Sequence, residues 1–148
     1  MNIFSFMIPK SLVVHINEDS TVRQALEKMK YHRYVAVPVL NSEGVYLGTL
    51  RNDDIFKYFH DNGRFDYKSA ERDTVAGILD SSYAKPLYHT ATIEEMIDRV
   101  GEHNFVSVVD DRGCFIGMIL RRDVLNFLSK YYKNAEKEKK TEEEAIKE

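Results

Sequence analysis

Two adjacent arginines, Arg121 and Arg122, stand where the sequence predicts the start of a helix. Cations there face the positive end of the helix dipole, which costs about a few tenths of a kcal/mol for each charge. A phosphorylated ligand would offset this cost, because arginine side chains and the free N–H groups of a helix start together bind phosphate. An exposed ion pair with Asp110, Asp111 or the acidic C-terminal residues explains the same sequence. The residues alone leave both interpretations open.

The residue types that catalysis requires do not form a known arrangement. No histidine has a second histidine three or four residues away, and the single cysteine, Cys114, lies in a predicted strand. Asp53 and Asp54 are neighbours in a predicted helix, so their carboxylates point apart rather than toward one metal ion. The sequence has neither a glycine-rich phosphate loop nor a Gly-x-Ser-x-Gly nucleophile turn. We therefore expect no enzyme activity, no metal site and no required cofactor.

The composition favours an intracellular folded protein over a nucleic-acid or membrane protein. The 148 residues are 43% hydrophobic and 30% charged, which is enough to bury a core. A net charge of -3 offers no basic surface for nucleic acid, and one cysteine cannot form an intrachain disulfide. The apolar residues 1–8 are too few to span a bilayer and lack the features of a signal peptide. We expect a cytoplasmic location, without a nucleic-acid or membrane partner.

The chain repeats one pattern of residues, which begins with a helix. Thr21 with Gln24, and Thr92 with Glu95, each form a capping box that predicts a helix start. Apolar residues at helical spacing follow each box. The two stripes consist of Val22, Ala25, Leu26, Met29 and of Ile93, Met96, Ile97, Val100.

A second block follows each of these helices and predicts a hairpin. The sequences PVLNSEGVYLG at residues 38–48 and SVVDDRGCFIG at residues 107–117 align without gaps. Each has an apolar strand, a polar turn that ends in glycine, and a second apolar strand. Gly44 and Gly113 are expected to supply the positive φ of that turn. Apolar residues at helical spacing after the hairpins predict a closing helix, so each half has the order α-β-β-α.

Two segments fall outside the repeats. Residues 61–74 are polar, have no counterpart in the first copy and predict a partly helical linker. Residues 133–148 are rich in Lys and Glu with almost nothing to bury, which predicts a solvated helical extension or a frayed tail. The resulting division is repeat 1 at residues 1–60, the linker at 61–74, repeat 2 at 75–132 and the tail at 133–148.

The duplicated order of helix, hairpin and Gly-to-Asp block resembles the tandem CBS-domain pair, or Bateman module. The matching residues are 34–40 with GTLRNDDI at 48–55, and 105–109 with GMILRRDV at 117–124. The resemblance implies an α/β (α+β) fold in which two α-β-β-α CBS repeats pack through their sheets about a pseudo-twofold axis. It also implies two clefts for adenosine-containing ligands, in a stand-alone module without a catalytic domain.

A narrower resemblance is to small bacterial CBS proteins that bind cyclic di-AMP. It rests on HRYVAVPVL at residues 32–40, on FDYK at 65–68 leading into residues 74–75, and on LRRDVL at 120–125. Cyclic di-AMP, AMP and ATP are therefore the nucleotides expected as regulatory ligands.

The resemblance gives binding roles to charged residues at the closing helices. Asp54 and Asp123 take the position whose carboxylate holds ribose hydroxyls in the family, although an acid that only stabilises the helix dipole is the common alternative. Arg121 and Arg122 become candidate phosphate ligands of the second repeat. Arg51 is the corresponding cation of the first repeat, whose cleft is expected to be less basic.

Tyr34, Val35 and Ala36 take the family position that offers backbone groups and an apolar face to adenine. Packing in the core or hairpin is the alternative for these three residues. Two departures distinguish this chain. Arg51 and Leu120 replace the Ser or Thr that the family commonly has three residues after the glycine, and Ser107 stands where the first copy has proline. We expect two unequal clefts, with the more anion-friendly one in the second repeat.

The resulting hypothesis is a regulatory sensor without catalytic activity. An adenine nucleotide binds between the repeats, shifts their packing, and an unidentified partner protein responds. The resemblance further implies a homodimer that uses the helices of both copies. The alternative is a protein interaction or dimerisation module whose nucleotide clefts are vestigial.

Overall fold

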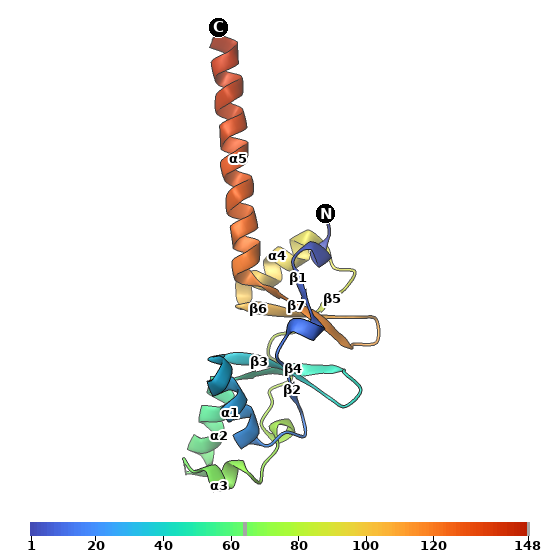
Figure 1. Ribbon diagram of the computed structural model, residues 1–148, viewed down its shortest axis with the longest axis vertical. Helices are drawn as coiled ribbons and strands as arrows, with labels where there is room; N and C mark the ends of the chain where they lie inside the picture. Colours follow the sequence, from blue (N-terminus) through green and yellow to red (C-terminus); the bar gives the residue numbers. More distant parts are fainter. Residues whose placement is uncertain (64, 148) are drawn as a thin grey trace.

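Two α/β halves lie with their sheets face to face and their helices on the outer sides (Figure 1). The computed structural model describes residues 1–63 and 65–147. Residues 64 and 148, which belong to the predicted linker and tail, lie outside the described residues. The mixed α/β architecture of two repeats confirms the predicted fold class.

Each half has the predicted helix, hairpin and closing helix, preceded by a two-residue strand that the sequence did not reveal. The first half consists of β2 (Ile16–Asn17), α1 (Val22–His32), β3 (Ala36–Leu40), β4 (Tyr46–Arg51) and α2 (Asn52–Asn62). The second consists of β5 (Leu87–Tyr88), α4 (Ile93–Glu102), β6 (Phe105–Val109), β7 (Phe115–Leu120) and α5 (Arg121–Lys147). The linker contains the short helix α3 (Tyr67–Ala70), and β1 (Met7–Pro9) precedes both halves. Two-residue strands are too short to show a period of two, so they leave no pattern.

Both capping boxes form as predicted. The Thr21 hydroxyl accepts a hydrogen bond from the Gln24 N–H at 3.1 Å, and the Gln24 side chain accepts one from the Thr21 N–H at 2.9 Å. Thr92 and Glu95 make the same pair of bonds at 3.2 and 2.7 Å. Each box satisfies N–H groups that the helix itself leaves free, so the two helices begin at equivalent residues.

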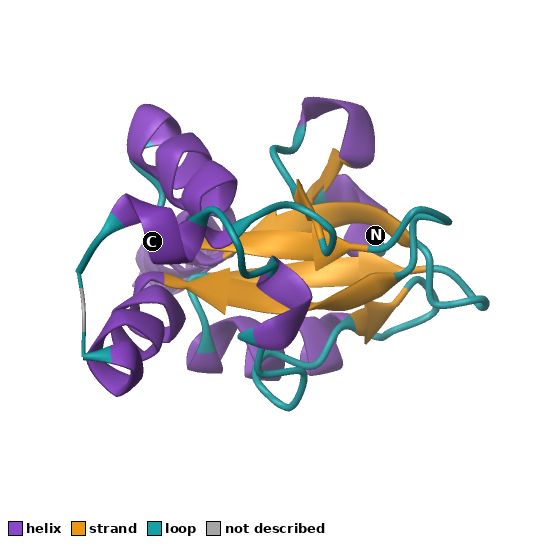
Figure 2. Ribbon diagram, turned by 90° about the horizontal axis from the view of Figure 1, so that it is seen from below, coloured by secondary structure: helices purple, strands orange, loops and turns teal. Residues whose placement is uncertain are grey.

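The two hairpins have equivalent registers and meet at their turns. Gly44 and Gly113 have φ values of 83° and 79°, as expected for the end of the turn. The Tyr46 N–H donates to the Gly113 carbonyl at 3.0 Å, and the Phe115 N–H donates to the Gly44 carbonyl at 2.9 Å. These reciprocal bonds join the halves at one end of the stacked sheets, whereas the α-helices gather mainly at the other end (Figure 2).

The N-terminal segment and the segment between the repeats cross from one half to the other. β1 pairs with β7, so the second sheet has the order β1-β7-β6-β5, and the first has the order β2-β3-β4. Ile3 is fully buried in the core of the second half. Ala70 and Val75 are fully buried in the core of the first, where the Val75 N–H donates to the Ser20 carbonyl at 2.8 Å. Packing thus crosses the proposed boundaries at residues 60 and 75, and each half completes the other's core.

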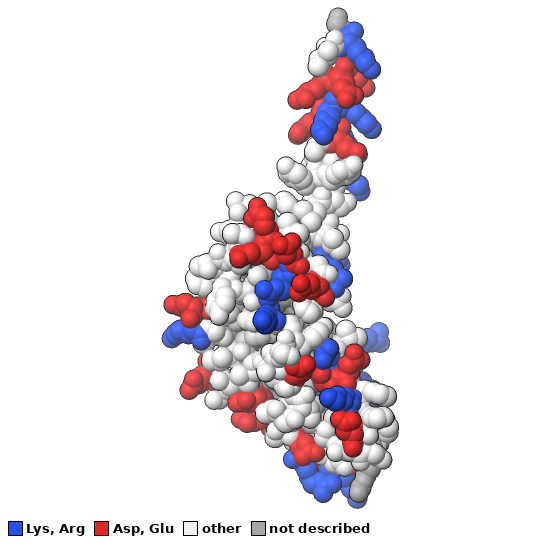
Figure 3. Space-filling view, turned by 180° about the vertical axis from the view of Figure 1, so that it is seen from behind, with Lys and Arg blue, Asp and Glu red and all other residues white. Residues whose placement is uncertain are grey.

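The closing helix of the second half continues well past the body of the molecule (Figure 1). The outer part of this helix carries side chains of both charges, and mostly uncharged side chains lie between that part and the body of the molecule (Figure 3). Tyr131 and Tyr132 of α5 are exposed aromatic residues. Of the two forms predicted for the tail, the structure has the helical extension. None of the helices within residues 1–63 and 65–147 combines the length and apolar character that crossing a membrane requires.

Candidate functional site

One open cleft of about 510 Å³ lies between the two halves. Its walls come from the segment before β2, from the start of β3, from the start of β6, and from the end of β7 into α5. Most of the wall is apolar, and two arginines, Arg33 and Arg122, complete it. The main apolar lining residues are Val13, Val14, Val35, Ala36, Pro38, Met118 and Leu120.

The end of α1 positions the first-half wall of this cleft. Arg33 caps the helix in the left-handed conformation, with φ at 58°. The Tyr34 N–H then donates to the Met29 carbonyl at 2.9 Å, which fixes the turn into β3. The Tyr34 ring stacks on the His32 ring at 5.4 Å. Backbone bonds and ring stacking therefore set the place of Arg33 and Tyr34, independently of any ligand.

The two adjacent arginines of the second half have different surroundings. The Arg121 Nε donates to the His103 carbonyl at 3.0 Å, so this side chain ties α5 to the loop before β6. Arg122 lines the cleft with a side chain that is 78% exposed, and its Nε lies 3.7 Å from the Asp123 carboxylate. So long and exposed a contact holds the guanidinium weakly. Arg122 is the arginine of the pair that is available to an anion.

Arg51 and Asp54 lie away from the open cleft and bind each other. The Asp54 carboxylate accepts bonds from the Arg51 Nη2 at 2.9 Å, its Nε at 3.2 Å and its backbone N–H at 2.8 Å. Asp54 is only 8% exposed. Hydrogen bonding to this carboxylate raises the pKa of Arg51 above its usual value. The pair borders a separate hollow of about 450 Å³ between α2 and residues 77–80.

The pseudo-twofold axis relates the open cleft to a second region between the halves. Tyr83 closes this second region. Its ring lies 3.7 Å from the Arg51 guanidinium carbon, and its hydroxyl lies 3.3 Å from the His103 Nδ1. Beside it, the Tyr46 hydroxyl donates to the Ala84 carbonyl at 2.9 Å and lies 2.8 Å from the Thr49 hydroxyl. Burial between the sheets raises the pKa of Tyr46. The protein's own side chains thus fill the second cleft.

The structure brings together four of the eight predicted site residues. Tyr34, Val35, Ala36 and Arg122 line the open cleft, Arg121 and Asp123 flank Arg122, and Arg51 and Asp54 form their own pair. The clefts were expected to lie between the repeats and to be unequal, with the more anion-friendly one in the second repeat. The open cleft combines β3 of the first half with β7 and α5 of the second, because the sheets lie face to face.

Sequence reasoning missed Arg33 and Tyr83. Arg33 lies directly before the predicted adenine segment and at the end of the predicted helix, so its position in sequence could have suggested it. Tyr83 lies in residues 80–86, a stretch without periodic pattern and without a counterpart in the first copy, so no signal marked it.

Comparison with known proteins gives consistent results. A family model of the CBS domain matches residues 7–61 and 81–130. "Cyclic di-AMP receptor B" of Bacillus subtilis (strain 168) is 25% identical over 132 residues, covering 89% of this chain and 89% of that protein. The crystal structure of CbpB in complex with c-di-AMP matches with a TM-score of 0.83 at 19% identity, over 93% of this chain and 91% of that one. Listeria monocytogenes CbpB in complex with c-di-AMP matches with a TM-score of 0.79 at 23% identity, over 88% and 97%.

The two segments matched by the family model contain both hairpins and both closing helices, in the order that the sequence repeat predicted. The solved structures share the fold. The chain therefore belongs to the CBS domain family and carries two copies of the domain.

Proposed function

We propose that this protein is a non-catalytic regulatory module that binds an adenine nucleotide in the open cleft and signals to a partner protein. The observation that carries the proposal is that Arg33 and Arg122, one from each half, line the same apolar cleft. The cleft volume of about 510 Å³ lies within the range of roughly 300–1,000 Å³ that is usual for small-molecule sites.

Cyclic di-AMP is the nucleotide that the cleft favours. Its two purines suit the apolar walls around Val35, Ala36 and Met118, and its two separate phosphodiester charges suit two separate arginines. AMP carries its charge on one phosphate and would use one of them. The similarity to the Bacillus subtilis receptor and to the two CbpB complexes with c-di-AMP supports the same choice.

Asp123 is proposed to hold ribose hydroxyls at the mouth of this cleft, beside Arg122. Arg121 acts by fixing the start of α5, through its bond to the His103 carbonyl. Because the ligand would contact both halves, it changes the relative free energy of their arrangements, and a partner can respond to that shift. We place the protein in the cytoplasm as a homodimer.

A thermal-shift panel of cyclic di-AMP, AMP, ADP, ATP and S-adenosylmethionine tests this function. A ligand at 100 times its dissociation constant should add about 2.7 kcal/mol to the free energy of unfolding. That is roughly 5–10 °C for a chain of this size. Arg122→Ala should remove most of the shift, whereas Arg72→Ala, in the linker, should keep it. No shift with any nucleotide would refute the sensor function.

The second candidate function is an interaction module with vestigial clefts. The filled second cleft favours it, because Tyr83 and the Arg51–Asp54 pair occupy the ligand space there. A flat thermal-shift panel together with a stable dimer in solution would support this alternative over the sensor.

A further inference from the structure

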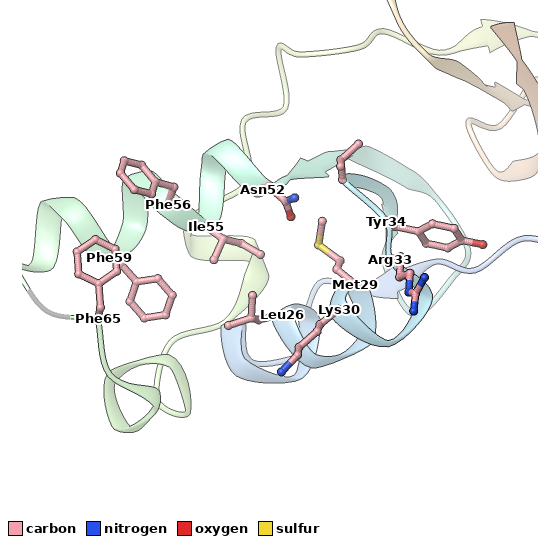
Figure 4. A pocket seen from close by; sticks show the side chains of 11 residues that line it. Leu26, Met29, Lys30, Arg33, Tyr34, Asn52, Ile55, Phe56, Phe59 and Phe65 are labelled. Atoms are coloured by element: carbon pink, nitrogen blue, oxygen red, sulfur yellow. The ribbon is translucent and has the colours of Figure 1, made fainter. Parts of the chain in front are cut away.

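The closing helix of the second half is longer than its counterpart in the first half. Gly63 ends α2 in the left-handed conformation, with φ at 65°. Phe65 then stacks on Phe59, with the ring centres 5.7 Å apart (Figure 4). The repeat places Tyr132 at the position of Gly63, but α5 continues past it, clear of the body of the molecule (Figure 1). No residue of the outer segment of α5, residues 130–147, is buried, so the core of the domain does not require this segment.

Four lysines form a stripe along one face of the outer segment. The members of this lysine stripe are Lys130, Lys133, Lys137 and Lys140. They follow one another at spacings of three and four residues, so they lie on one side of the helix over about 15 Å. All four are exposed, and in the part of the chain that the structure describes none of them forms an ion pair. Glu136, the carboxylate beside the stripe, accepts a hydrogen bond from the Tyr132 hydroxyl at 2.9 Å.

The lysine stripe does not stabilise the helix that carries it. Like charges three or four residues apart lie next to each other on the helix surface and repel. Other charges of the outer segment have the stabilising arrangement. Glu143 precedes Lys147 by four residues, and Lys139, on the far face, lies three and four residues from Glu142 and Glu143. The sorting of four lysines onto one face therefore points to an anionic group outside the chain.

Carboxylates on the other faces limit what can dock on the lysine stripe. Glu138 and Glu142 lie on the opposite side of the helix, and Glu144 follows the stripe on its own face, so both charges appear on the outer segment (Figure 3). A nucleic-acid duplex or an anionic membrane is wider than one helix and brings phosphates within about 10 Å of these carboxylates, where like charges repel. An acidic helix presents its carboxylates in a stripe of the same width and spacing. The charge pattern favours a helix as the partner.

We propose that the lysine stripe of α5 is the docking site for an acidic helix of the partner protein, with carboxylates at matching spacings of three and four residues. The two helices lie side by side, and opposite charges pair along the stripe. The proposal rests on the proposed function for its regulatory meaning, because that function requires a partner protein. Arg122, which lines the nucleotide cleft, lies in the first turn of the same helix. A nucleotide that shifts the start of α5 therefore moves the lysine stripe with it.

Two synthetic helical peptides test the docking site. One carries glutamates at spacings of three and four residues along one face of an alanine-rich helix, and the other has the same composition with the glutamates spread around the helix. The striped peptide should bind the full-length protein with a Kd of about 1 mM or lower at low salt, measured by NMR titration. It should bind at least about fivefold more tightly than the spread peptide, because only its charges all face the lysines. The amide signals that shift should be those of residues 130–140.

Substitution of single lysines locates the surface. Lys137→Gln, in the lysine stripe, should raise the Kd of the striped peptide about threefold, the effect of losing one exposed ion pair. Lys139→Gln is the matched control, because it removes the same charge two residues further along the helix but on the far face, and it should leave the Kd unchanged. Lys133→Glu combined with Lys137→Glu should abolish binding of the striped peptide and allow binding of a peptide with lysines in place of the glutamates. Far-UV circular dichroism shows whether α5 stays helical in each variant.

Equal affinity for the two peptides, or no binding of either at millimolar concentration, would overturn the docking site. So would equal effects of Lys137→Gln and Lys139→Gln. A duplex oligonucleotide or phosphatidylserine vesicles that bind through the same lysines more tightly than the striped peptide would overturn the choice of an acidic helix. The titrations are made without nucleotide, and nucleotide binding is measured separately by thermal shift. Failure of the docking site and failure of the nucleotide sensor are therefore distinguishable.

Discussion

Tyr83 closes the second cleft, so removing its ring should change both the stability of the protein and the number of nucleotides it binds. Tyr83→Ala removes the ring 3.7 Å from the Arg51 guanidinium carbon and the hydroxyl 3.3 Å from the His103 Nδ1. A partly exposed cation–π contact contributes about 0.5–1 kcal/mol. A hydrogen bond contributes about 0.5–1.5 kcal/mol, and the half-buried ring adds roughly 1 kcal/mol of apolar burial. We expect a total loss of about 2–3 kcal/mol.

A loss of that size should lower Tm by about 4–10 °C for a chain of this length, measured by differential scanning calorimetry. The same variant should bind two molecules of cyclic di-AMP per chain by isothermal titration calorimetry, where the wild type binds one. Tyr83→Phe is the matched control, because it keeps the ring and loses only the hydroxyl. It should cost about 1 kcal/mol and leave one site. If Tyr83→Ala keeps the wild-type Tm and still binds one nucleotide, Tyr83 does not close a ligand site.

Three further predictions have defined outcomes. Asp123→Asn should weaken the binding of a ribose-bearing nucleotide about tenfold, because a charge-assisted hydrogen bond becomes a neutral one, and Tm should stay unchanged. Unchanged affinity in titration calorimetry would place Asp123 outside the site. Gly117→Ala should lower the free energy of unfolding in urea by about 1–3 kcal/mol, since the added Cβ would clash with the Ile8 carbonyl oxygen of β1. Gly101→Ala, with open space around it, should be neutral or stabilising. Burial and the hydrogen bond to Asp73 raise the pKa of Tyr58 to about 12, so this group stabilises the fold fully below pH 10 and loses its contribution as the pH rises through 12. Tyr58→Phe should therefore flatten the loss of stability between pH 10 and 12 in alkaline unfolding, and an unchanged slope would exclude Tyr58 as its source.

Local patterns in the sequence were enough to predict the repeated elements. Capping boxes, helical stripes and glycine-ended turns act through hydrogen bonds and contacts within a few residues, so the sequence carries them directly. Thr21, Thr92, Gly44 and Gly113 all take the predicted roles. Their duplication then pointed to the CBS family, which the family model confirmed.

The composition of the candidate site depended on contacts between distant residues. Arg33 and Arg122 are far apart in sequence and line one cleft because the two sheets stack face to face. The left-handed cap that positions Arg33 is usually made by glycine, so an arginine gave no sign of it. Likewise, nothing near Arg51 in the sequence indicates that Tyr83 would cover it.

The sequence by itself determined the two copies of the domain, their helices and hairpins, and the set of charged residues that could bind a nucleotide. The tertiary structure alone decided which cleft is open, which arginine is available, and that β1 completes the sheet of the second half. The physical reason is the separation in sequence over which the deciding interactions act. A helix cap or hairpin turn is settled by neighbouring residues, whereas the free volume of a cleft depends on side chains brought together from both halves of the chain.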